Sequence, residues 1–372
     1  MRKRLLIIII PSLILIIICS YFILKQKHTF NSSIKVEGKA VIGDMSTCSG
    51  TCNITVSKKL ELLEVIQYLA DDPLIIKKYK DNTYENYIKG IDKYFTDYKG
   101  HKVIRLYKEM RGKGFSYGRI PELTLKIDEN FNLSEGSPEI SKYLDDSGIS
   151  SEELDTFLEQ VRDFYTKANF DEFYLSQKDF YNSLLAKTKN LADKVNFIDK
   201  LNEYYGYKQE SYNIFIYPLI NGGFADRIQT ASGRYDIYDF MKMPTTEIDF
   251  MLLLIHEFGH AYTGPLTYTK YSENVGKFSS CYEKIRDKMK KQNYMTWGNS
   301  LDELINRAVT IRILTEIYGD KVGNNKLNQN IKEGFIYIDM ICESLKKYEV
   351  MRDKYPIFDD YYLEILKTLP EQ

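Results

Sequence analysis

Several kinds of residue and pattern are scarce in this chain, and their scarcity narrows the possible functions. Lys and Arg (51) balance Asp and Glu (52), so the net charge of −1 argues against nucleic acid as a partner. No internal repeat is present, and no aromatic repeat supports a structural protein that binds cell-wall glycans. The length of 372 residues suffices for one large domain or two ordinary ones.

Cysteine is also rare, with five residues. Cys48 and Cys52 flank a short turn, but no second CxxC motif or nearby histidine completes a metal site. A disulfide or free thiols are therefore favoured for this pair. Cys281 and Cys342 are expected to pair only if the fold brings them together.

The N-terminus lacks the A-x-A pattern of a cleaved signal peptide. A basic tip, residues 1–4, precedes the apolar run 5–24, and twenty residues of helix span about 30 Å, the thickness of a bilayer core. A lipoprotein signal at Cys19 is disfavoured because the bulky Ile18 precedes it. We therefore expect an uncleaved transmembrane signal anchor in the cell membrane, single-pass, with a cytoplasmic tip and an extracytoplasmic remainder.

The remainder is predicted to be α+β and predominantly helical. Residues 25–57 form a tether and a short β-hairpin, placed within 34–57. Residues 58–372 form one domain, with a helical part at 58–205 and a second part at 206–372. Apolar periodicity predicts helices in segments 58–69, 84–98, 103–110, 151–165, 170–187 and 190–205. Strands are predicted at 212–220 and 233–238, and a strand or extended segment at 123–133.

The most informative motif is HExxH at residues 256–260, which follows the apolar run 250–255. The i,i+4 spacing places His256 and His260 on one helical face, where both can bind one Zn²⁺ ion. Glu257 is then positioned as the general base for a metal-activated water. The competing interpretation is a buried helix whose two histidines form hydrogen bonds within the core.

The limits of this helix are also predicted. Thr246 with Asp249 matches a capping box at its start, and Gly264-Pro265 reads as its end. Gly259 lowers helix propensity, so we expect a packing reason for it. The other two histidines are expected to be structural or solvated: His101 near a helix start and His28 beside the membrane.

A catalytic zinc usually has three protein ligands, and no histidine follows His260. The extended motif HExxHxxGxxH fails at Thr263 and Leu266, so a carboxylate is expected, with Cys281 or an upstream histidine less favoured. Glu303 is preferred because it lies near the start of an apolar helix, where a buried carboxylate needs a partner.

Two structural roles for Glu303 compete with zinc binding. Ser300 and Glu303 match a capping box, and Arg307 lies one turn onward as an ion-pair partner. Four other acidic residues are weaker candidates for the third ligand: Asp302, Glu273, Glu283 and Glu316.

HExxH followed by a glutamate on a downstream helix resembles the gluzincin pattern of thermolysin-like peptidases. More closely, the chain resembles an uncharacterised bacterial family, a domain of unknown function regarded as membrane-anchored metallopeptidases. The stretches that carry this resemblance are 94–103, 161–165, 212–223, 256–260 and 303–308. The resemblance implies a zincin-like fold with a small twisted sheet before the HExxH helix. It also implies His256, His260 and Glu303 as zinc ligands and Glu257 as base. Two features depart from thermolysin-like enzymes: Arg307 stands where they have an aspartate, and the spacing from His260 to Glu303 is longer.

The sequence thus predicts a zinc metallopeptidase, a hydrolase acting on a peptide or protein substrate. Residues 212–217 are expected to be an edge strand that binds an extended substrate. Candidates for stabilising the oxyanion are Tyr262, Tyr268, Tyr271 and Arg307. The alternative function is a non-catalytic envelope binding or sensor domain on a metallopeptidase scaffold. Neither the substrate specificity nor the oligomeric state follows from the sequence.

Overall fold

The computed structural model describes residues 43–78, 81–116, 118–134, 140–194, 196–243 and 246–370. The predicted tip and anchor, together with Cys19 and His28, lie outside these ranges. Within them, no helix combines the length and the apolar character that crossing a bilayer requires. Residues 44–372 form one compact unit, which is predominantly helical with one small sheet, as the predicted α+β class requires.

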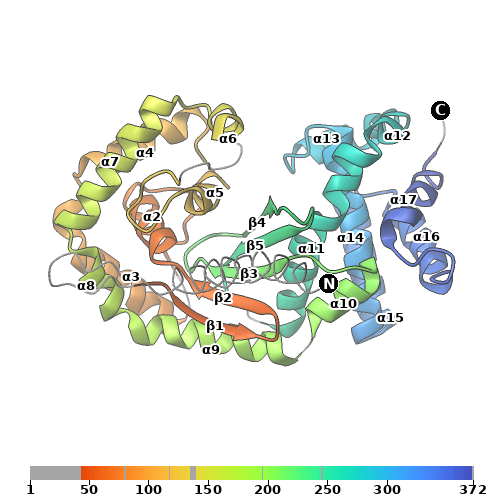
Figure 1. The fold of residues 1–372 in the computed structure, drawn as a ribbon, viewed down its shortest axis with the longest axis horizontal. Helices are drawn as coiled ribbons and strands as arrows, with labels where there is room; N and C mark the ends of the chain where they lie inside the picture. Colours follow the sequence, from red (N-terminus) through yellow and green to blue (C-terminus); the bar gives the residue numbers. More distant parts are fainter. Residues whose placement is uncertain are drawn as a thin grey trace, which may run out of the picture. The chain divides into compact units, whose positions relative to one another are not determined.

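The sheet has five strands in the order β1-β2-β3-β5-β4 (Figure 1). Its members are β1 (Met45–Ser49), β2 (Cys52–Val56), β3 (Ser211–Ile216), β4 (Gly223–Gln229) and β5 (Tyr235–Met241). The hairpin expected within 34–57 is the antiparallel pair of β1 and β2, and β4 pairs antiparallel with β5. The central pairings of β3, with β2 and with β5, are both parallel.

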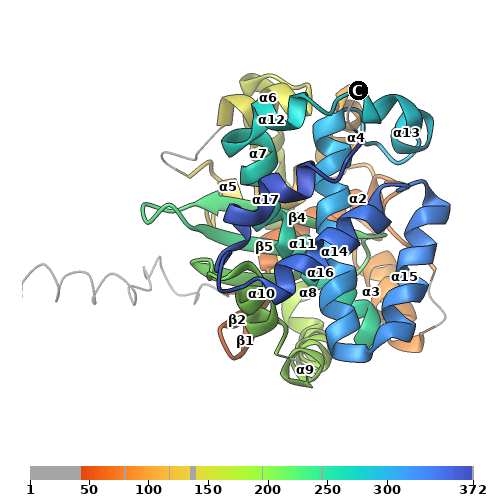
Figure 2. The ribbon, with the colours of Figure 1, turned by 90° about the vertical axis from the view of Figure 1, so that its right-hand side faces the viewer.

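Helices make up most of the remaining structure. Those before β3 are α2 (Lys58–Leu69), α3 (Asn82–Tyr94), α4 (Lys102–Lys113), α5 (Arg119–Lys126), α6 (Ile140–Ser147), α7 (Ser151–Lys167), α8 (Phe170–Ser176), α9 (Lys178–Lys194) and α10 (Phe197–Tyr205), with a 3-10 turn, η1 (Thr96–Tyr98). Those after β5 are α11 (Glu247–Pro265), the π-helical η2 (Leu266–Lys270), α12 (Ser272–Gly276), α13 (Cys281–Lys290), α14 (Trp297–Tyr318), α15 (Asp320–Glu333), α16 (Ile338–Val350) and α17 (Phe358–Leu366). In Figure 2, α15 and α16 both lie beside α14, against which they pack.

The two faces of the sheet are distinguished by alternation of its side chains. Tyr212 of β3 points to α11, where its hydroxyl lies 2.7 Å from that of Tyr262 and its ring contacts Phe258. The opposite face carries a stacked pair, Phe215 and Phe240. The sheet therefore packs, through the face that carries Tyr212, against the helix that bears the HExxH motif.

Helix α2 is unusual because every residue except Lys59 is buried, including several polar ones. Lys58 forms an ion pair with Asp171 at 3.1 Å. Glu64 accepts a hydrogen bond from the backbone N–H of Leu219 at 2.6 Å, just after β3. Since buried polar groups need partners, these contacts join α2 to its neighbours and to the chain that leaves the sheet.

Glu61, on the same helix, gives a prediction about pH. Burial raises the pKa of Glu61 to about 8, outweighing the nearby Tyr181 hydroxyl. The folded state then keeps a proton that the unfolded state loses above its ordinary pKa, so stability falls as pH rises from about 4.5 to about 8. We expect Glu61→Gln to reduce this loss, by an amount of the order of several kcal/mol, when urea unfolding is compared at about pH 5 and about pH 8.5.

The stability of that variant should still depend on pH to some extent, since burial also raises the pKa of Glu64. An exposed carboxylate, Glu343→Gln, serves as the control, and it should leave the pH dependence unchanged. An unaltered pH dependence in Glu61→Gln would show that the Glu61 carboxyl titrates alike in both states.

Some predicted boundaries were wrong. The segment 123–133, predicted as a strand or an extended segment, begins inside α5, which occupies 119–126, and is irregular from Ile127, where an isolated bridge joins Ile127 to Leu133. Ile120, Leu123 and Thr124 are buried with helical spacing, and the prediction began too late to include the first turn. Helix 170–187 is two helices, α8 and α9, and the predicted strand 233–238 is β5, shifted by a few residues.

The four described cysteines are all free thiols, which is one of the two states expected for Cys48 and Cys52. In the β1–β2 register, Cys48 faces Asn53 while Cys52 faces Ser49. The two cysteines therefore point to opposite faces of the hairpin and cannot bond to each other. Cys281 and Cys342 are each buried on a different helix, α13 and α16.

Candidate metal centre

The two histidines of the motif converge as their spacing predicts. Thr246 caps α11, its side chain accepting the backbone N–H of Asp249 at 3.1 Å, which confirms the predicted helix start. His256 and His260 then project from one face of the helix, and their Nε2 atoms lie 3.3 Å apart. Both rings are only partly exposed.

The predicted end of this α-helix is confirmed, since α11 ends at Pro265. The chain does not leave the helical path there, however, because it continues directly into the π-helical η2 as far as Lys270. A proline at this position has no N–H for the carbonyl of Ala261, four residues earlier. The side chain of Gln209 supplies the missing donor, with Nε2 3.3 Å from that carbonyl. A residue from before β3 thus allows the helix to pass its proline.

Glu303 reaches the two histidines from α14. Its Oε1 lies 3.4 Å from Nε2 of His256, and its Oε2 lies 3.6 Å from Nε2 of His260. The carboxylate is buried, with a side-chain exposure of 5 %. These residues are the group of three in the described chain whose ligand atoms all lie within 4.8 Å of one another.

The spacing of these donors fits a zinc ion. In a tetrahedral site with bonds of about 2.0–2.1 Å, neighbouring ligand atoms are separated by about 3.3–3.4 Å. The three separations of 3.3, 3.4 and 3.6 Å are close to that value. Two imidazoles and one carboxylate are also a donor set that zinc accepts, with a fourth position left for water or substrate.

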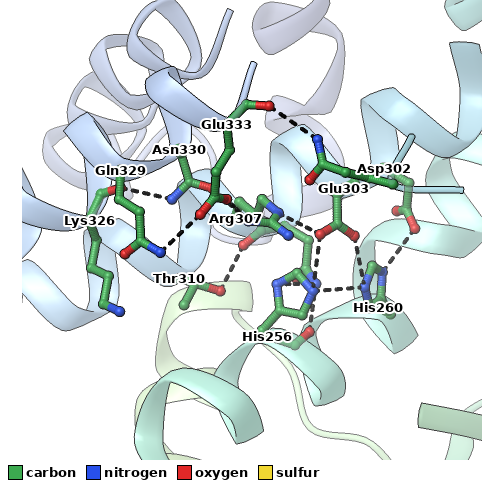
Figure 3. Close-up of polar contacts among 12 residues, drawn as sticks. His256, His260, Asp302, Glu303, Arg307, Thr310, Lys326, Gln329, Asn330 and Glu333 are labelled. Atoms are coloured by element: carbon green, nitrogen blue, oxygen red, sulfur yellow. Dashed lines mark hydrogen bonds and ion pairs between the residues drawn. The ribbon is translucent and has the colours of Figure 1, made fainter. Parts of the chain in front are cut away.

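The two structural roles predicted for Glu303 have different outcomes. The capping box with Ser300 was wrong, because α14 begins at Trp297 and is capped by Thr296, so Ser300 lies inside the helix. The ion pair with Arg307 is present, its Nε donating to Oε1 of Glu303 (Figure 3). This pair does not compete with the convergence on the histidines, since the carboxylate contacts both.

Arg307 is held in turn by α15. Its Nη1 donates to Oδ1 of Asn330 at 2.8 Å and lies 3.2 Å from the carboxylate of Glu333. The guanidinium also lies 4.3 Å from the centre of the Phe335 ring. Figure 3 shows this chain of contacts, which runs from α15 through Arg307 to Glu303. The orientation of the candidate third ligand therefore depends on a helix later in the chain.

Asp302 has a different position from the one predicted. It was a weaker candidate for the third ligand, but its Oδ2 lies behind His260, 2.9 Å from Nδ1. A carboxylate in this place fixes the ring orientation and leaves Nε2 for a metal.

Gly259 has the packing reason that its low helix propensity suggested. A Cβ atom at this position would collide with the side chain of Asn306 on α14. The amide of Asn306 instead donates to the backbone carbonyl of His256. The glycine therefore lets α11 and α14 approach closely enough for Glu303 to reach the histidines.

Burial and the neighbouring charges shift the pKa values of these groups in different directions. Burial lowers the pKa of His256 to about 4 and raises the pKa of Glu257 to about 7. Burial alone would lower the pKa of His260, but Asp302 outweighs it and the value rises to about 9. For Glu303, burial is opposed by His256 and Arg307, which lower the pKa to about 2. The carboxylate of Glu303 therefore stays ionised and available to a cation.

A cleft of about 1100 Å³ opens onto this group. Its lining includes Glu257 and the three converging residues, together with strand β4. The wall contributed by the helical part includes Glu122, Leu125 and Lys126 of α5. Glu257 and the metal-ligand candidates therefore share one cleft large enough for a polymer chain.

The four candidates for stabilising an oxyanion differ in whether they line the cleft. Tyr262 is buried against Tyr212, Tyr271 donates to the backbone carbonyl of Asp359, and Arg307 is occupied behind Glu303. Only Tyr268 of the four lines the cleft, with 46 % exposure, and burial raises its pKa to about 12.

Tyr294 and Arg227 also line the cleft, and sequence reasoning did not select them. Neither has a sequence signal, because the chain has 31 tyrosines and β4 was not predicted.

The remaining candidate residues lie elsewhere. Glu283 pairs with Arg286, Glu316 pairs with Lys200 at 2.6 Å, and Glu273 is exposed on α12. His101 caps α4, its Nδ1 accepting the N–H of Val103, as its expected structural role requires. Cys281 has its sulfur 3.6 Å from the carbonyl of Pro370.

Comparison with known proteins gives one match. No curated protein and no solved structure matches the chain. A family model described as "Domain of unknown function (DUF4932)" matches residues 52–368, which includes strands β2 to β5, α11 and α14. The chain therefore belongs to the DUF4932 family, whose function its description leaves open.

Proposed function

We propose that this protein is a zinc-dependent peptidase of gluzincin type. The observation that carries the proposal is the convergence of His256, His260 and Glu303 at zinc-like separations, with Glu257 in the same cleft. A site that served only structure would be expected to close its shell with a fourth residue. The described cleft instead leaves room on the side of Glu257.

The chemistry divides between the ion and the chain. A zinc ion bound there would supply a Lewis acid that polarises a carbonyl and makes water nucleophilic near neutral pH. Glu257 would accept the proton of the attacking water and deliver it to the leaving amine. Asp302 would hold His260 in one orientation, and Arg307 would do the same for Glu303.

Charge that develops on the carbonyl oxygen needs a donor. Tyr268 and Tyr294 are the tyrosines of the described cleft that lie on the helical side, and they replace the longer list of candidates from the sequence. Burial and the Glu303 carboxylate raise the pKa of Tyr294, so its hydroxyl keeps its proton and can donate it in a hydrogen bond.

The strand that would bind substrate differs from the one predicted. Strand β3 pairs on both sides and has no free edge, whereas β4 is at the end of the sheet and lines the cleft. The backbone N–H of Thr230 donates to the carbonyl of Arg234, and hydrogen-bonded pairs alternate in an antiparallel ladder. The backbone of Ala225 therefore faces outward, where an extended peptide would add as a further strand.

A membrane location remains part of the proposal. It rests on the apolar run 5–24 and the basic residues before it, which would place residues 44–372 outside the cytoplasm.

The alternative is a binding or sensor domain without catalysis. Glu257 counts against it, because a carboxylate next to the site is unnecessary for binding and unfavourable to bury, as its raised pKa indicates.

The two functions are distinguished by metal content and cleavage measured together. The purified full-length chain should bind one zinc ion and cleave members of a mixed peptide pool. A chelator should abolish cleavage, and added zinc should restore it. Zinc bound without cleavage of any peptide would favour the sensor, and absence of zinc binding would contradict both versions of the metal site.

A further inference from the structure

The side chain of Arg227 lies in the cleft beside the candidate metal centre. Arg227 is on β4, opposite Ile237 of β5, so its side chain points to the α11 face of the sheet. Its Nη1 donates to the backbone carbonyl of His260 at 3.1 Å. The guanidinium also lies 5.5 Å from the centre of the Tyr235 ring.

The helix makes room for this guanidinium. A Cβ atom at Gly264 would lie 2.9 Å from Nη2 and 3.1 Å from Nη1 of Arg227. Gly264 is one turn beyond His260, on the same side of α11. The absence of a side chain there lets the guanidinium lie directly against the helix.

Among the described residues, no carboxylate forms an ion pair with the guanidinium of Arg227. The neighbouring Asp226 accepts the backbone N–H of Arg227, and the charge of Arg227 partly opposes the rise that burial causes in the pKa of the Asp226 carboxyl. By contrast, Arg307 contacts two carboxylates. A guanidinium has five N–H donors, and within the described part of the chain the hydrogen bond to His260 uses one of those on Arg227, which leaves the others for a ligand. A partly buried cation of this kind favours an anionic partner.

The guanidinium lies against Gly264, one helical turn beyond His260. Side chains of a helix tilt toward its N-terminus, so the imidazoles of His256 and His260 carry the metal position away from Gly264. Arg227 is therefore placed to contact a substrate residue beyond the bond that is cleaved.

The relative direction of β4 and α11 decides on which side of the cleaved bond Arg227 lies. Gly223, at the start of β4, faces Leu253 of α11, while Arg227, near its end, faces Gly264. The two elements therefore run in the same direction, with the metal centre between these contacts. A substrate paired antiparallel to β4 runs the opposite way, which places Arg227 on the N-terminal side of the cleaved bond.

We propose that Arg227 selects an acidic side chain on the N-terminal side of the bond that the peptidase cleaves, an inference that rests on the proposed function. Carboxylate is the anion that a peptide carries at internal positions, and it matches the guanidinium in two-point hydrogen bonding. Gly264 is a positioning residue for this contact, since it admits the guanidinium.

The test uses the full-length, zinc-loaded chain and a pool of unstructured peptides randomised at every position. New termini are identified by mass spectrometry. We expect Asp and Glu to be enriched by about tenfold at one position on the N-terminal side of the cut. Arg227→Gln should remove the enrichment, and Arg227→Glu should shift it toward Lys and Arg.

Two further variants separate selection from folding. Gly264→Ala keeps Arg227 but displaces its guanidinium, so it should weaken the acidic preference while α11 gains helix propensity. Arg234→Gln, on the exposed hairpin that joins β4 and β5, is the matched control and should behave as the parent. Melting curves establish that each variant is folded.

The outcomes distinguish this inference from the proposed function. Cleavage with no acidic preference, or the same preference in Arg227→Gln, would overturn the role of Arg227 alone. Failure of the parent chain to cleave any peptide would overturn the peptidase assignment, and this inference with it.

Discussion

Glu257→Gln should bind zinc as the parent chain does and lose peptide cleavage by about 10²–10⁴-fold. The amide has nearly the shape of the carboxyl, so the cleft and the positions of His256 and His260 should not change. It cannot accept the proton of the attacking water, which removes general-base catalysis. Zinc content by atomic spectroscopy and initial rates on one cleaved peptide measure the two quantities.

Glu283→Gln is the matched control for that substitution. Glu283 is a glutamate on α13, exposed and paired with Arg286, and it does not line the cleft. Its variant should keep both zinc and activity. If Glu257→Gln cleaves as fast as the parent chain, Glu257 is not the base and the proposed mechanism is wrong.

Glu303→Gln should strongly weaken zinc binding, whereas Glu257→Gln should keep its zinc and lose only peptide cleavage. A neutral amide is a poor zinc ligand, and the two histidines alone leave the ion with an incomplete shell. The substitution also leaves the partly buried guanidinium of Arg307 with Glu333 as its carboxylate partner among the described residues. We expect zinc affinity to fall by more than the roughly 10–100-fold that changes behind metal ligands produce.

Competition with a chromophoric chelator measures this affinity, and melting curves measure the stability. Glu316→Gln is the control on the same helix, since Glu316 is exposed and pairs with Lys200 away from the cleft. It should bind zinc as the parent does. Zinc affinity that is unchanged in Glu303→Gln would exclude Glu303 from the metal shell.

Local sequence patterns predicted much of the helical structure and the part of the site that lies on α11. The i,i+4 spacing of His256 and His260 fixes their common face within a single helix, because helical geometry alone sets it. The capping of α11 by Thr246 is equally local, since the residues involved are three positions apart. The capping box expected at Ser300 failed for a related reason: α14 begins one turn earlier, at a cap of the same chemical type, Thr296.

Strand β4 shows where local patterns were insufficient. Its sequence, Gly-Phe-Ala-Asp-Arg-Ile-Gln, is mixed in polarity because the strand is at the end of the sheet and lines the cleft, where none of its residues is fully buried. The apolar strand β3 was easier to recognise in the sequence. It is apolar because it is buried between two neighbouring strands, β2 and β5, and a strand in that position has no free edge. The substrate edge was therefore assigned to the wrong strand.

The sequence by itself determined the paired imidazoles, the adjacent carboxylate of Glu257 and the helix that carries them, because each depends on neighbours within a few residues. Only the tertiary structure decided that Glu303 joins the pair, that Asp302 supports His260 and that Arg227 lies along the same cleft. These contacts cross between α11, α14 and β4, and the spacing of such elements depends on packing at positions such as Gly259 and Gly264, where a missing side chain sets the distance.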